Sequence, residues 1–491
     1  MRMPFERQQN RRYHNQPMKR CRKLGVEAIY ESYQIRSDVP YSTEFLDSVI
    51  KAYDIRGLVD SQLSSKLAHD VGTLFAQQVK STVVIGEDMR PSSPQLADAF
   101  ASGVMEQGFD VIRIGLASTD QLYFASGYLN LPGAMFTASH NPAEYNGIKL
   151  CRAGAAPVGK ESGLTQIRDG LLEELPAITS DLGATTSRDV LLDYVHYLQS
   201  LVDLKNIRSL KIVVDAGNGM GGHTVPRTFE NLPITLIPLY FELDGTFPNH
   251  EANPIDPANL KDLQAAVSLH GADLGLAFDG DADRCFVVDE NANIVSPSTL
   301  TAVIAARELA KAPGAPVIYN LISSKAVPEV IREHGGVSVR SRVGHSYIKA
   351  LMASEGAVFG GEHSGHFYFA NFWNADSGML AALHVISALG NTSPGTTLSS
   401  LLQEFDRYSA SGEINSKVVD AKQVMNRIKE IYKVQTNLAI DELDGITVSA
   451  GDWWFNVRAS NTEPLLRLNV EAESLELMNY IKDEVLGVIN G

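Results

Sequence analysis

Residues 211–219 read Lys-Ile-Val-Val-Asp-Ala-Gly-Asn-Gly, a short β-branched run that ends in a polar, glycine-containing loop. The same outline occurs at residues 82–88 and 316–324, so the three runs lie roughly 100–130 residues apart. Such runs are typical of buried parallel strands. Amphipathic helical sequence flanks them, for example at residues 96–107 and 299–312. Strands that alternate with helices predict three related mixed α/β sandwich domains.

The C-terminal part of the chain has a different pattern. Residues 444–450 and 453–458 predict two antiparallel strands, and a third strand at 465–472 is followed by a helix at 474–489. This pattern indicates a smaller α+β domain. Loop-like stretches at 179–188, 293–298, 390–395 and 409–412 separate the units. We therefore expect a tail and four domains with the bounds 1–45, 46–187, 188–297, 298–410 and 411–491.

The composition is that of an ordinary globular protein. The chain has 491 residues, of which 44% are hydrophobic and 20% charged, and this length predicts roughly two to four domains. A net charge of −16 argues against nucleic acid as a partner. No run approaches the roughly 20 apolar residues that span a bilayer, so we expect no membrane partner. Three widely spaced cysteines fit a reducing compartment, and we predict a cytoplasmic location.

The N-terminal segment differs in charge from the rest. Residues 1–45 carry nine Lys/Arg and five Asp/Glu, a net charge of +4, so residues 46–491 carry −20. The segment has no apolar core of a secretory signal. We predict a disordered basic tail or an over-long reading frame, although Arg-rich, acid-poor segments are also typical of transit peptides.

A serine in the first α/β unit is the strongest candidate for chemistry. Ser139 lies in Thr137-Ala-Ser-His-Asn-Pro142, where Pro142 stiffens a turn and His140 is a neighbouring polar group. A serine hydroxyl is a poor nucleophile unless it is activated or already phosphorylated. Taken alone, the stretch also fits a surface turn.

Three alternating carboxylates follow a predicted strand in the second unit. Asp279, Asp281 and Asp283 can converge in a loop, and their repulsion calls for a cation. Oxygen ligands suit Mg²⁺, which often takes a phosphate oxygen as a further ligand, so a phosphorylated Ser139 could complete the set. Arg284 beside them is a candidate phosphate ligand. The alternative is a solvated Gly/Asp turn.

Two further polar stretches lie in the last two units. In residues 360–366, Glu362 and Ser364 are spaced to hold adjacent sugar hydroxyls, although a glycine turn explains the composition equally well. Residues 458–464 combine a guanidinium, hydroxyls and an amide that fit a phosphate dianion, with Arg467 as a further donor. A capped turn is the alternative there. Residues 51–57 and 343–349 add aromatic and cationic groups and His345, which has a pKa suited to acid–base work.

Together these residues resemble the α-D-phosphohexomutase superfamily over about residues 47–491. Four motifs occur in the family's order: Thr137–Pro142, Asp279–Arg284, Gly361–Gly365 and Arg458–Thr462. The resemblance implies four domains around a central cleft, with one motif from each domain. It also implies a phosphoryl group on Ser139, and Mg²⁺ held by that phosphate, Asp279, Asp281 and Asp283.

The remaining roles are likewise implied by the resemblance. Glu362, Ser364 and their neighbour His363 would lie at the sugar, and the anchor for the non-reacting phosphate would be formed by Arg458, Ser460, Asn461, Thr462 and, more weakly, Arg467. Groups near the reacting centre would be Tyr53, Arg56, His140 and Lys149. His345 matches the family's histidine in Gly-His-Ser and is expected to be catalytic, and the expected substrate contacts include Tyr53, Arg284 and Arg342. Arg342 replaces a lysine common in the family, Asn469 replaces an arginine, and His363 replaces a methionine or glutamine.

The implied reaction is a phosphohexomutase reaction. Phosphoserine 139 gives its phosphoryl group to a hexose phosphate, the 1,6-bisphosphate turns end for end, and the other phosphate returns to Ser139. Residues 53–57 are similar to the phosphomannomutase/phosphoglucomutase branch, so mannose phosphates are the expected substrates and glucose phosphates a second class. Alternatives are a phosphoglucosamine mutase, a metal-dependent phosphatase and a non-catalytic phosphosugar-binding protein. Either a monomer or a homodimer is compatible with the sequence.

Overall fold

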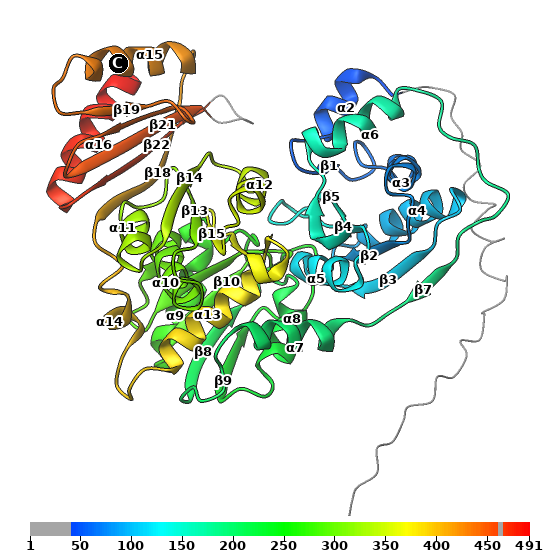
Figure 1. The fold of residues 1–491 in the computed structure, drawn as a ribbon, viewed down its shortest axis with the longest axis horizontal. Helices are drawn as coiled ribbons and strands as arrows, with labels where there is room; N and C mark the ends of the chain where they lie inside the picture. Colours follow the sequence, from blue (N-terminus) through cyan, green and yellow to red (C-terminus); the bar gives the residue numbers. More distant parts are fainter. Residues whose placement is uncertain (1–40, 460–464) are drawn as a thin grey trace, which may run out of the picture. The chain divides into compact units, whose positions relative to one another are not determined.

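The computed structural model describes residues 41–459 and 465–491, apart from the side chains of residues 345 and 346 (Figure 1). By contacts the chain divides into residues 1–40 and residues 41–491, and the second unit holds four sheets. The predicted tail therefore lies outside the described residues up to residue 40. Helix α2 (Thr43–Val49) begins inside the range 1–45 that we predicted as tail.

The first domain is built on a seven-stranded mixed sheet with the order β1-β5-β4-β2-β3-β7, in which β6 pairs with β5. Its strands are β1 (Ile55–Leu58), β2 (Val83–Glu87), β3 (Val111–Leu116), β4 (Gly133–Phe136), β5 (Tyr145–Arg152), β6 (Ala156–Pro157) and β7 (Thr185–Ser187). Its further helices are α3 (Ser65–Val79), α4 (Ser93–Glu106), α5 (Thr119–Leu129), α6 (Leu164–Leu171) and the short 3-10 turns η1 (Ala153–Ala155) and η2 (Lys160–Ser162).

Strand β2 shows why an uninterrupted apolar run marks the centre of this sheet. Val83 and Ile85 belong to the hydrophobic cluster that includes α3 and α4, whereas Val84 belongs to the cluster that includes α5. Successive side chains of a strand point to opposite faces, so helices on both faces require apolar residues at every position. The sheet is therefore covered on two sides, as the predicted sandwich requires.

The second domain has a five-stranded sheet with the order β12-β11-β10-β8-β9. Strands β8 (Leu210–Asp215), β9 (Ile234–Leu239) and β10 (Leu274–Phe278) are parallel, and the antiparallel part consists of β11 (Cys285–Asp289) and β12 (Ile294–Val295). Its helices are α7 (Leu191–Leu201), α8 (Gly221–Phe229), η3 (Pro257–Leu260) and α9 (Lys261–His270).

The third domain repeats this layout with the strand order β14-β13-β15-β16-β17. Its strands are β13 (Pro316–Asn320), β14 (Val337–Ser341), β15 (Phe359–Gly361), β16 (Phe367–Phe369) and β17 (Ala375–Asp376). Its helices are α10 (Pro297–Lys311), α11 (Ala326–Glu333), α12 (His345–Glu355), η4 (Ala370–Phe372), α13 (Gly378–Gly390) and α14 (Leu398–Leu402).

The fourth domain is an antiparallel sheet with the order β18-β22-β21-β20-β19 and two helices on one face (Figure 1). Its elements are β18 (Ser409–Lys417), α15 (Ala421–Lys433), β19 (Ala439–Asp441), β20 (Ile446–Ser449), β21 (Trp453–Ala459), β22 (Leu465–Ala472) and α16 (Leu475–Asn490). The four-domain α/β prediction is confirmed. The loops expected at 179–188 and 409–412 instead contain β7 and the start of β18.

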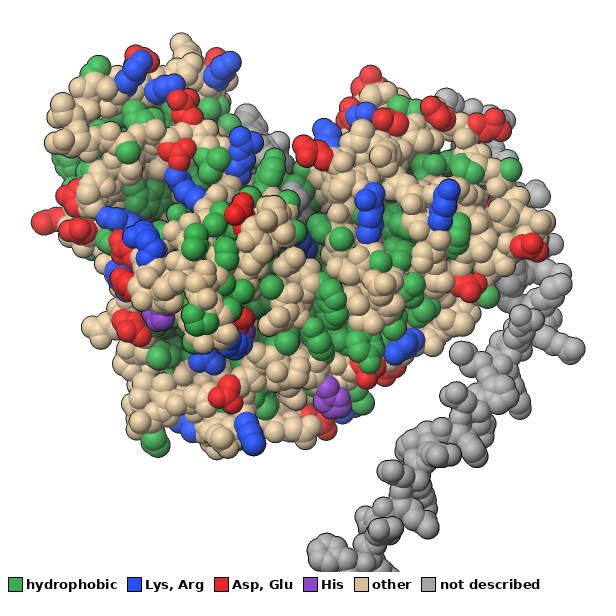
Figure 2. Space-filling model, in the orientation of Figure 1, with side chains coloured by type: hydrophobic (Ala, Val, Ile, Leu, Met, Phe, Trp, Pro, Cys, Tyr) green, Lys and Arg blue, Asp and Glu red, His purple; other side chains and the backbone are tan. Residues whose placement is uncertain are grey.

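The chemistry-bearing motifs follow strand ends. The serine stretch follows β4, the three aspartates follow β10 and Glu362 follows β15. In α/β sheets, loops at the carboxyl ends of strands are where ligands bind, because these loops are free to vary while the strands hold them in place. Figure 2 shows acidic and basic side chains interspersed over the visible face. None of the helices in the described part of the chain has the length and apolar character needed to cross a membrane.

Candidate active site

Ser139 occupies a constrained loop between β4 and β5. Its φ is 53°, in the left-handed region, and the residue is 4% exposed. A non-glycine residue in this region costs about 1–2 kcal/mol, so the surrounding contacts must hold it there. One such contact is a hydrogen bond that the Ser139 backbone N–H donates to Thr137 Oγ1 at 2.9 Å. The hydroxyl itself donates to Asp279 Oδ2 at 2.8 Å, which links the first and second domains.

Asp279, Asp281 and Asp283 lie together in the loop between β10 and β11. All three are buried, and one carboxylate oxygen of each lies within 4.8 Å of the others. Among the described residues, Asp281 Oδ1 and Asp283 Oδ1 have no hydrogen-bond partner. Buried carboxylate oxygens without donors are costly unless a cation compensates them. These oxygen donors fit Mg²⁺, and the Ser139 hydroxyl marks where a phosphate oxygen would join them.

Two cations already offset part of this negative charge. Lys149 Nζ lies 2.7 Å from both Asp281 Oδ2 and Asp283 Oδ2. Arg284 donates to Asp279 Oδ2 through Nε at 2.8 Å. Burial raises the pKa of Asp279 to about 7, an effect that Arg284 opposes. Burial acts in the same direction on Asp281, but Lys149 overcomes it and lowers the pKa of that carboxyl.

His140 and Arg56 complete the surroundings of the serine. Burial, together with Arg284, lowers the pKa of His140 well below its usual range, so its imidazole is neutral near pH 7. Its Nδ1 lies 3.2 Å from Ser139 Oγ. Arg56 Nη1 donates to Asn141 Oδ1 at 2.7 Å. The structure thus brings the predicted groups Ser139, His140, Lys149, Arg284 and the three aspartates into one connected network, and Arg56 reaches the serine loop through Asn141.

The proposed sugar loop is held by hydrogen bonds from neighbouring segments. Glu362 is 2% exposed, and its two carboxylate oxygens accept from the Gly344 backbone N–H at 3.1 Å and from the Tyr368 hydroxyl at 2.7 Å. Ser364 is half-buried in the same loop. His363 Nδ1 is a buried atom without a hydrogen-bond partner among the described residues, and burial lowers the pKa of this histidine.

The predicted phosphate anchor is partly described. Arg458 is 5% exposed; its Nη1 donates to Asn469 Oδ1 at 2.9 Å and its Nη2 pairs with Glu413 Oε2. Arg467 Nη1 lies 3.5 Å from the other oxygen of Glu413. Two guanidinium groups therefore share one carboxylate on β18. The predicted anchor residues Ser460, Asn461 and Thr462 lie outside the described residues.

Three other predicted residues lie in or beside the loop that precedes α12. Arg342 is exposed, and Tyr53 is half-buried. A Cβ placed on Gly344 would lie 2.6 Å from the Tyr53 hydroxyl, so the first domain approaches this loop closely. The backbone of His345 begins α12, and its side chain lies outside the described part of the structure.

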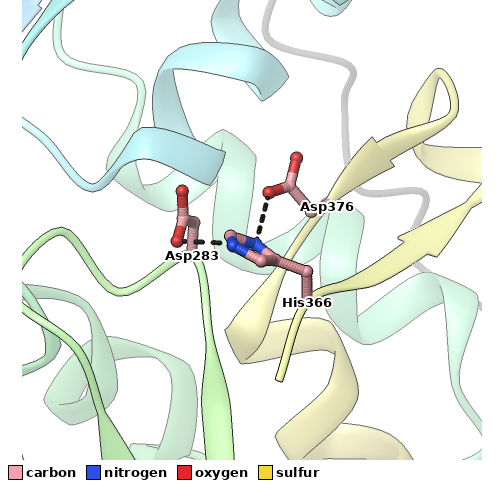
Figure 3. Close-up of side chains that lie close together, drawn as sticks. All are labelled: Asp283, His366 and Asp376. Carbon is pink, nitrogen blue, oxygen red and sulfur yellow. Dashed lines mark hydrogen bonds and ion pairs between the residues drawn. The ribbon is translucent and has the colours of Figure 1, made fainter. Parts of the chain in front are cut away.

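A histidine without a predicted role lies beside the aspartates (Figure 3). His366 Nδ1 lies 2.9 Å from Asp376 Oδ2 and 3.8 Å from Asp283 Oδ1. Burial disfavours its protonation, but Asp283 and Asp376 more than compensate and raise its pKa. An imidazole in such a position is suited to general acid–base work. His366 closes the quoted stretch 360–366, so its place in that loop was the available signal.

Comparison with known proteins shows which family the chain belongs to. Models of the phosphoglucomutase/phosphomannomutase family match in chain order: α/β/α domain I at residues 47–175, domain II at 192–292, domain III at 297–408 and the C-terminal domain at 413–488. A curated "Phosphohexose mutases" protein of Xanthomonas campestris pv. campestris is 40% identical over 445 residues, which cover 90% of this chain and 99% of that protein.

Two further relatives extend the comparison. A phosphomannomutase of Vibrio cholerae serotype O1 is 39% identical over 454 residues, covering 89% of this chain and 97% of that protein. The crystal structure of a phosphoglucomutase/phosphomannomutase family protein from Burkholderia thailandensis aligns with a TM-score of 0.81 and 30% identity, covering 91% of this chain and 97% of that chain. With four domain models matched in order and near-full-length relatives of this similarity, the chain belongs to the phosphoglucomutase/phosphomannomutase family.

Proposed function

We propose that the protein is a phosphomannomutase that interconverts mannose 6-phosphate and mannose 1-phosphate through a phosphoserine at Ser139 and a hexose 1,6-bisphosphate. Curated relatives that are 37–39% identical over nearly their full length support this reaction, because they are named phosphomannomutases. Glucose phosphates are the second substrate class, supported by the dual name of the matched family.

The contact between Ser139 Oγ and Asp279 Oδ2 carries the proposal. These residues are 140 positions apart in the sequence, yet the hydroxyl lies 2.8 Å from the carboxylate in a buried site. A phosphoryl group on Ser139 would then lie against the aspartates and within reach of Arg284, whose Nη2 is 3.4 Å from the hydroxyl. Fixed cationic donors at such a position stabilise the charge that develops during phosphoryl transfer.

Each group of residues has a proposed task. Asp279, Asp281 and Asp283 would hold Mg²⁺, which when bound neutralises charge on the phosphoryl oxygens. Lys149 and Arg284 orient the carboxylates, and the neutral His140 accepts a hydrogen bond from Arg284 Nη2 beside the Ser139 hydroxyl. The reaction depends on the same anchor taking up either phosphate of the bisphosphate.

The third and fourth domains supply the proposed substrate contacts. Glu362, His363 and Ser364 lie at the sugar. Arg458 and Arg467 hold the non-reacting phosphate together with Ser460, Asn461 and Thr462. The pairing of both arginines with Glu413 supports a site that exchanges one anion for another, because a phosphate dianion can replace a carboxylate as their partner. Tyr53 and Arg342 are proposed substrate contacts, and His345 a catalytic group. The cytoplasmic location and the choice between monomer and homodimer remain predictions.

A coupled assay with three substrates tests the proposal. The purified protein is supplied with Mg²⁺, a trace of hexose 1,6-bisphosphate, and the 1-phosphate of mannose, glucose or glucosamine. We expect kcat/KM to be highest for mannose, lower for glucose and lowest for glucosamine. Turnover of glucosamine 1-phosphate that equals or exceeds that of mannose 1-phosphate would contradict the proposed substrate class. Release of inorganic phosphate without any isomer would instead indicate a phosphatase.

A further inference from the structure

Arg90 lies in the loop that follows β2, in the sequence Asp88-Met-Arg90, and none of the proposed tasks involves it. It is 1% exposed and is one of the largest fully buried side chains among the described residues. Burying a guanidinium is expensive unless charges and acceptors surround it. The environment of this side chain therefore identifies what it does.

The Arg90 guanidinium donates to four backbone carbonyls of the loop that carries Ser139. Nη2 donates to the carbonyls of Ser139 at 3.0 Å and of Asn141 at 2.6 Å. Nη1 donates to the carbonyls of Pro142 at 2.8 Å and of Tyr145 at 2.9 Å. One planar group therefore holds the loop from the serine to the start of β5.

Other contacts hold the guanidinium itself in place. Its Nε lies 3.3 Å from Asp88 Oδ2, and the Arg90 backbone N–H donates to Asp88 Oδ1 at 3.0 Å. The ring of Phe247 covers it, with 5.0 Å between the guanidinium carbon and the ring centroid. Gly245 approaches so closely that an added Cβ would lie 2.6 Å from Arg90 Cα. The loop after β9 in the second domain thus packs over an arginine of the first.

We infer that Arg90 is the positioning residue that sets the orientation of Ser139 for phosphoryl transfer, an inference that rests on the proposed function. Ser139 has a left-handed backbone, and its own carbonyl is one of the four acceptors, so the guanidinium holds the strained residue directly. All four acceptors are main-chain atoms, so the contact fixes the path of the backbone. A lysine keeps the charge, but its single ammonium cannot reproduce two parallel pairs of hydrogen bonds.

The test compares Arg90→Lys with Arg113→Lys. Arg113 lies on β3 of the same domain and pairs with Glu87 and Asp98, away from the serine loop, so it controls for the loss of a guanidinium. Phosphoryl transfer from glucose 1,6-bisphosphate to Ser139 is followed by rapid quench, and binding of mannose 1-phosphate by calorimetry. A misplacement of about 1 Å costs on the order of 100-fold in rate. We expect Arg90→Lys to slow transfer about 100-fold with Kd within about threefold of wild type, and Arg113→Lys to change neither.

A milder variant decides the question if Arg90→Lys does not fold. Phe247→Leu removes the ring over the guanidinium while keeping an apolar cover, and we expect transfer to slow about fivefold or more with binding retained. Transfer at the wild-type rate in folded Arg90→Lys, or in Phe247→Leu if only that variant folds, would overturn the inference. An equal fall in the transfer rate of Arg113→Lys would also overturn the inference. A wild-type protein without mutase turnover would instead refute the proposed function, so the two failures are distinguishable.

Discussion

Gly280→Ala adds only one methyl group, but we expect it to lower kcat strongly. Gly280 lies between the first two aspartates, and a Cβ on it would lie 2.4 Å from the Ser139 carbonyl oxygen. Real Cβ atoms contact oxygens at 3.4 Å or more in ordinary packing, so the two loops must separate by about 1 Å, from 3.4 minus 2.4. A hydrogen bond on the other side resists movement of the aspartate loop, because the Gly280 carbonyl accepts from the Met220 backbone N–H at 2.9 Å.

A separation of this size acts on the reacting atoms. The contact between Ser139 Oγ and Asp279 Oδ2 is part of the same junction, and about 1 Å of misplacement costs on the order of 100-fold in rate. Overpacking adds a loss of about 1–3 kcal/mol in the free energy of unfolding. We therefore expect kcat to fall about 100-fold while KM for mannose 1-phosphate stays within about threefold, because the proposed sugar and phosphate contacts lie on other loops.

The assay is steady-state turnover at saturating hexose 1,6-bisphosphate, with urea unfolding in parallel. Gly487→Ala is the matched control, because a Cβ at Gly487 in α16 meets nothing within 4 Å. That variant should keep its kcat and lose no stability. A Gly280→Ala enzyme with kcat within about threefold of wild type would refute the interlocking of the two loops.

Three further predictions concern the metal, the sugar loop and a pH effect. Mg²⁺ should raise the melting temperature of the wild-type protein and not that of Asp281→Ala, and chelation should abolish turnover until Mg²⁺ is restored; an equal thermal shift in both proteins would argue against the aspartate site. Tyr368→Phe leaves a buried oxygen of Glu362 without its donor, so urea unfolding should show a loss of about 1–3 kcal/mol, and an unchanged midpoint would contradict that reading. Burial lowers the pKa of His69, but hydrogen bonds to Asp70 and Glu106 outweigh this effect and raise the pKa from 6.5 to about 9. Because the pKa of His69 is higher in the folded state, its contribution to stability is fully present below pH 6.5 and is lost as the pH rises through about 9, by up to about 3 kcal/mol. His69→Gln should remove this pH dependence of the free energy of unfolding, measured by urea unfolding. A fall in stability of the same size in both proteins would assign the pH dependence to other groups.

Much of the architecture could be predicted because its signals are contiguous in the sequence. The run 211–215 forms β8, and the analogous runs form β2 and β13, since a strand covered on both faces must be apolar throughout. Strand β18 was missed for the opposite reason. Its sequence Ser-Ala-Ser-Gly-Glu-Ile-Asn-Ser-Lys alternates between half-buried and exposed positions at the edge of its sheet, so its composition resembles that of a loop.

The candidate site divides in the same way. Ser139 and the three aspartates were identifiable because each motif is a short polar segment directly after an apolar strand. The roles of Arg90 and Asp376 were not identifiable, because each depends on partners about 10 to 50 residues away, such as Ser139 and His366, and no local pattern marks those pairings. Only the folded chain shows that the Arg90 guanidinium donates hydrogen bonds to four carbonyls of one loop.

The central claim is that Ser139 is the residue that carries and returns the phosphoryl group. Its most direct test is to mix wild-type protein and Ser139→Ala with radiolabelled hexose 1,6-bisphosphate and map the label by peptide mass spectrometry. The account predicts one phosphoryl group on Ser139 of the wild-type protein, which chases into mannose 6-phosphate on addition of mannose 1-phosphate. It also predicts no labelled peptide and a loss of turnover by orders of magnitude in Ser139→Ala. Label on another residue, or a Ser139→Ala enzyme that turns over at the wild-type rate, would contradict it.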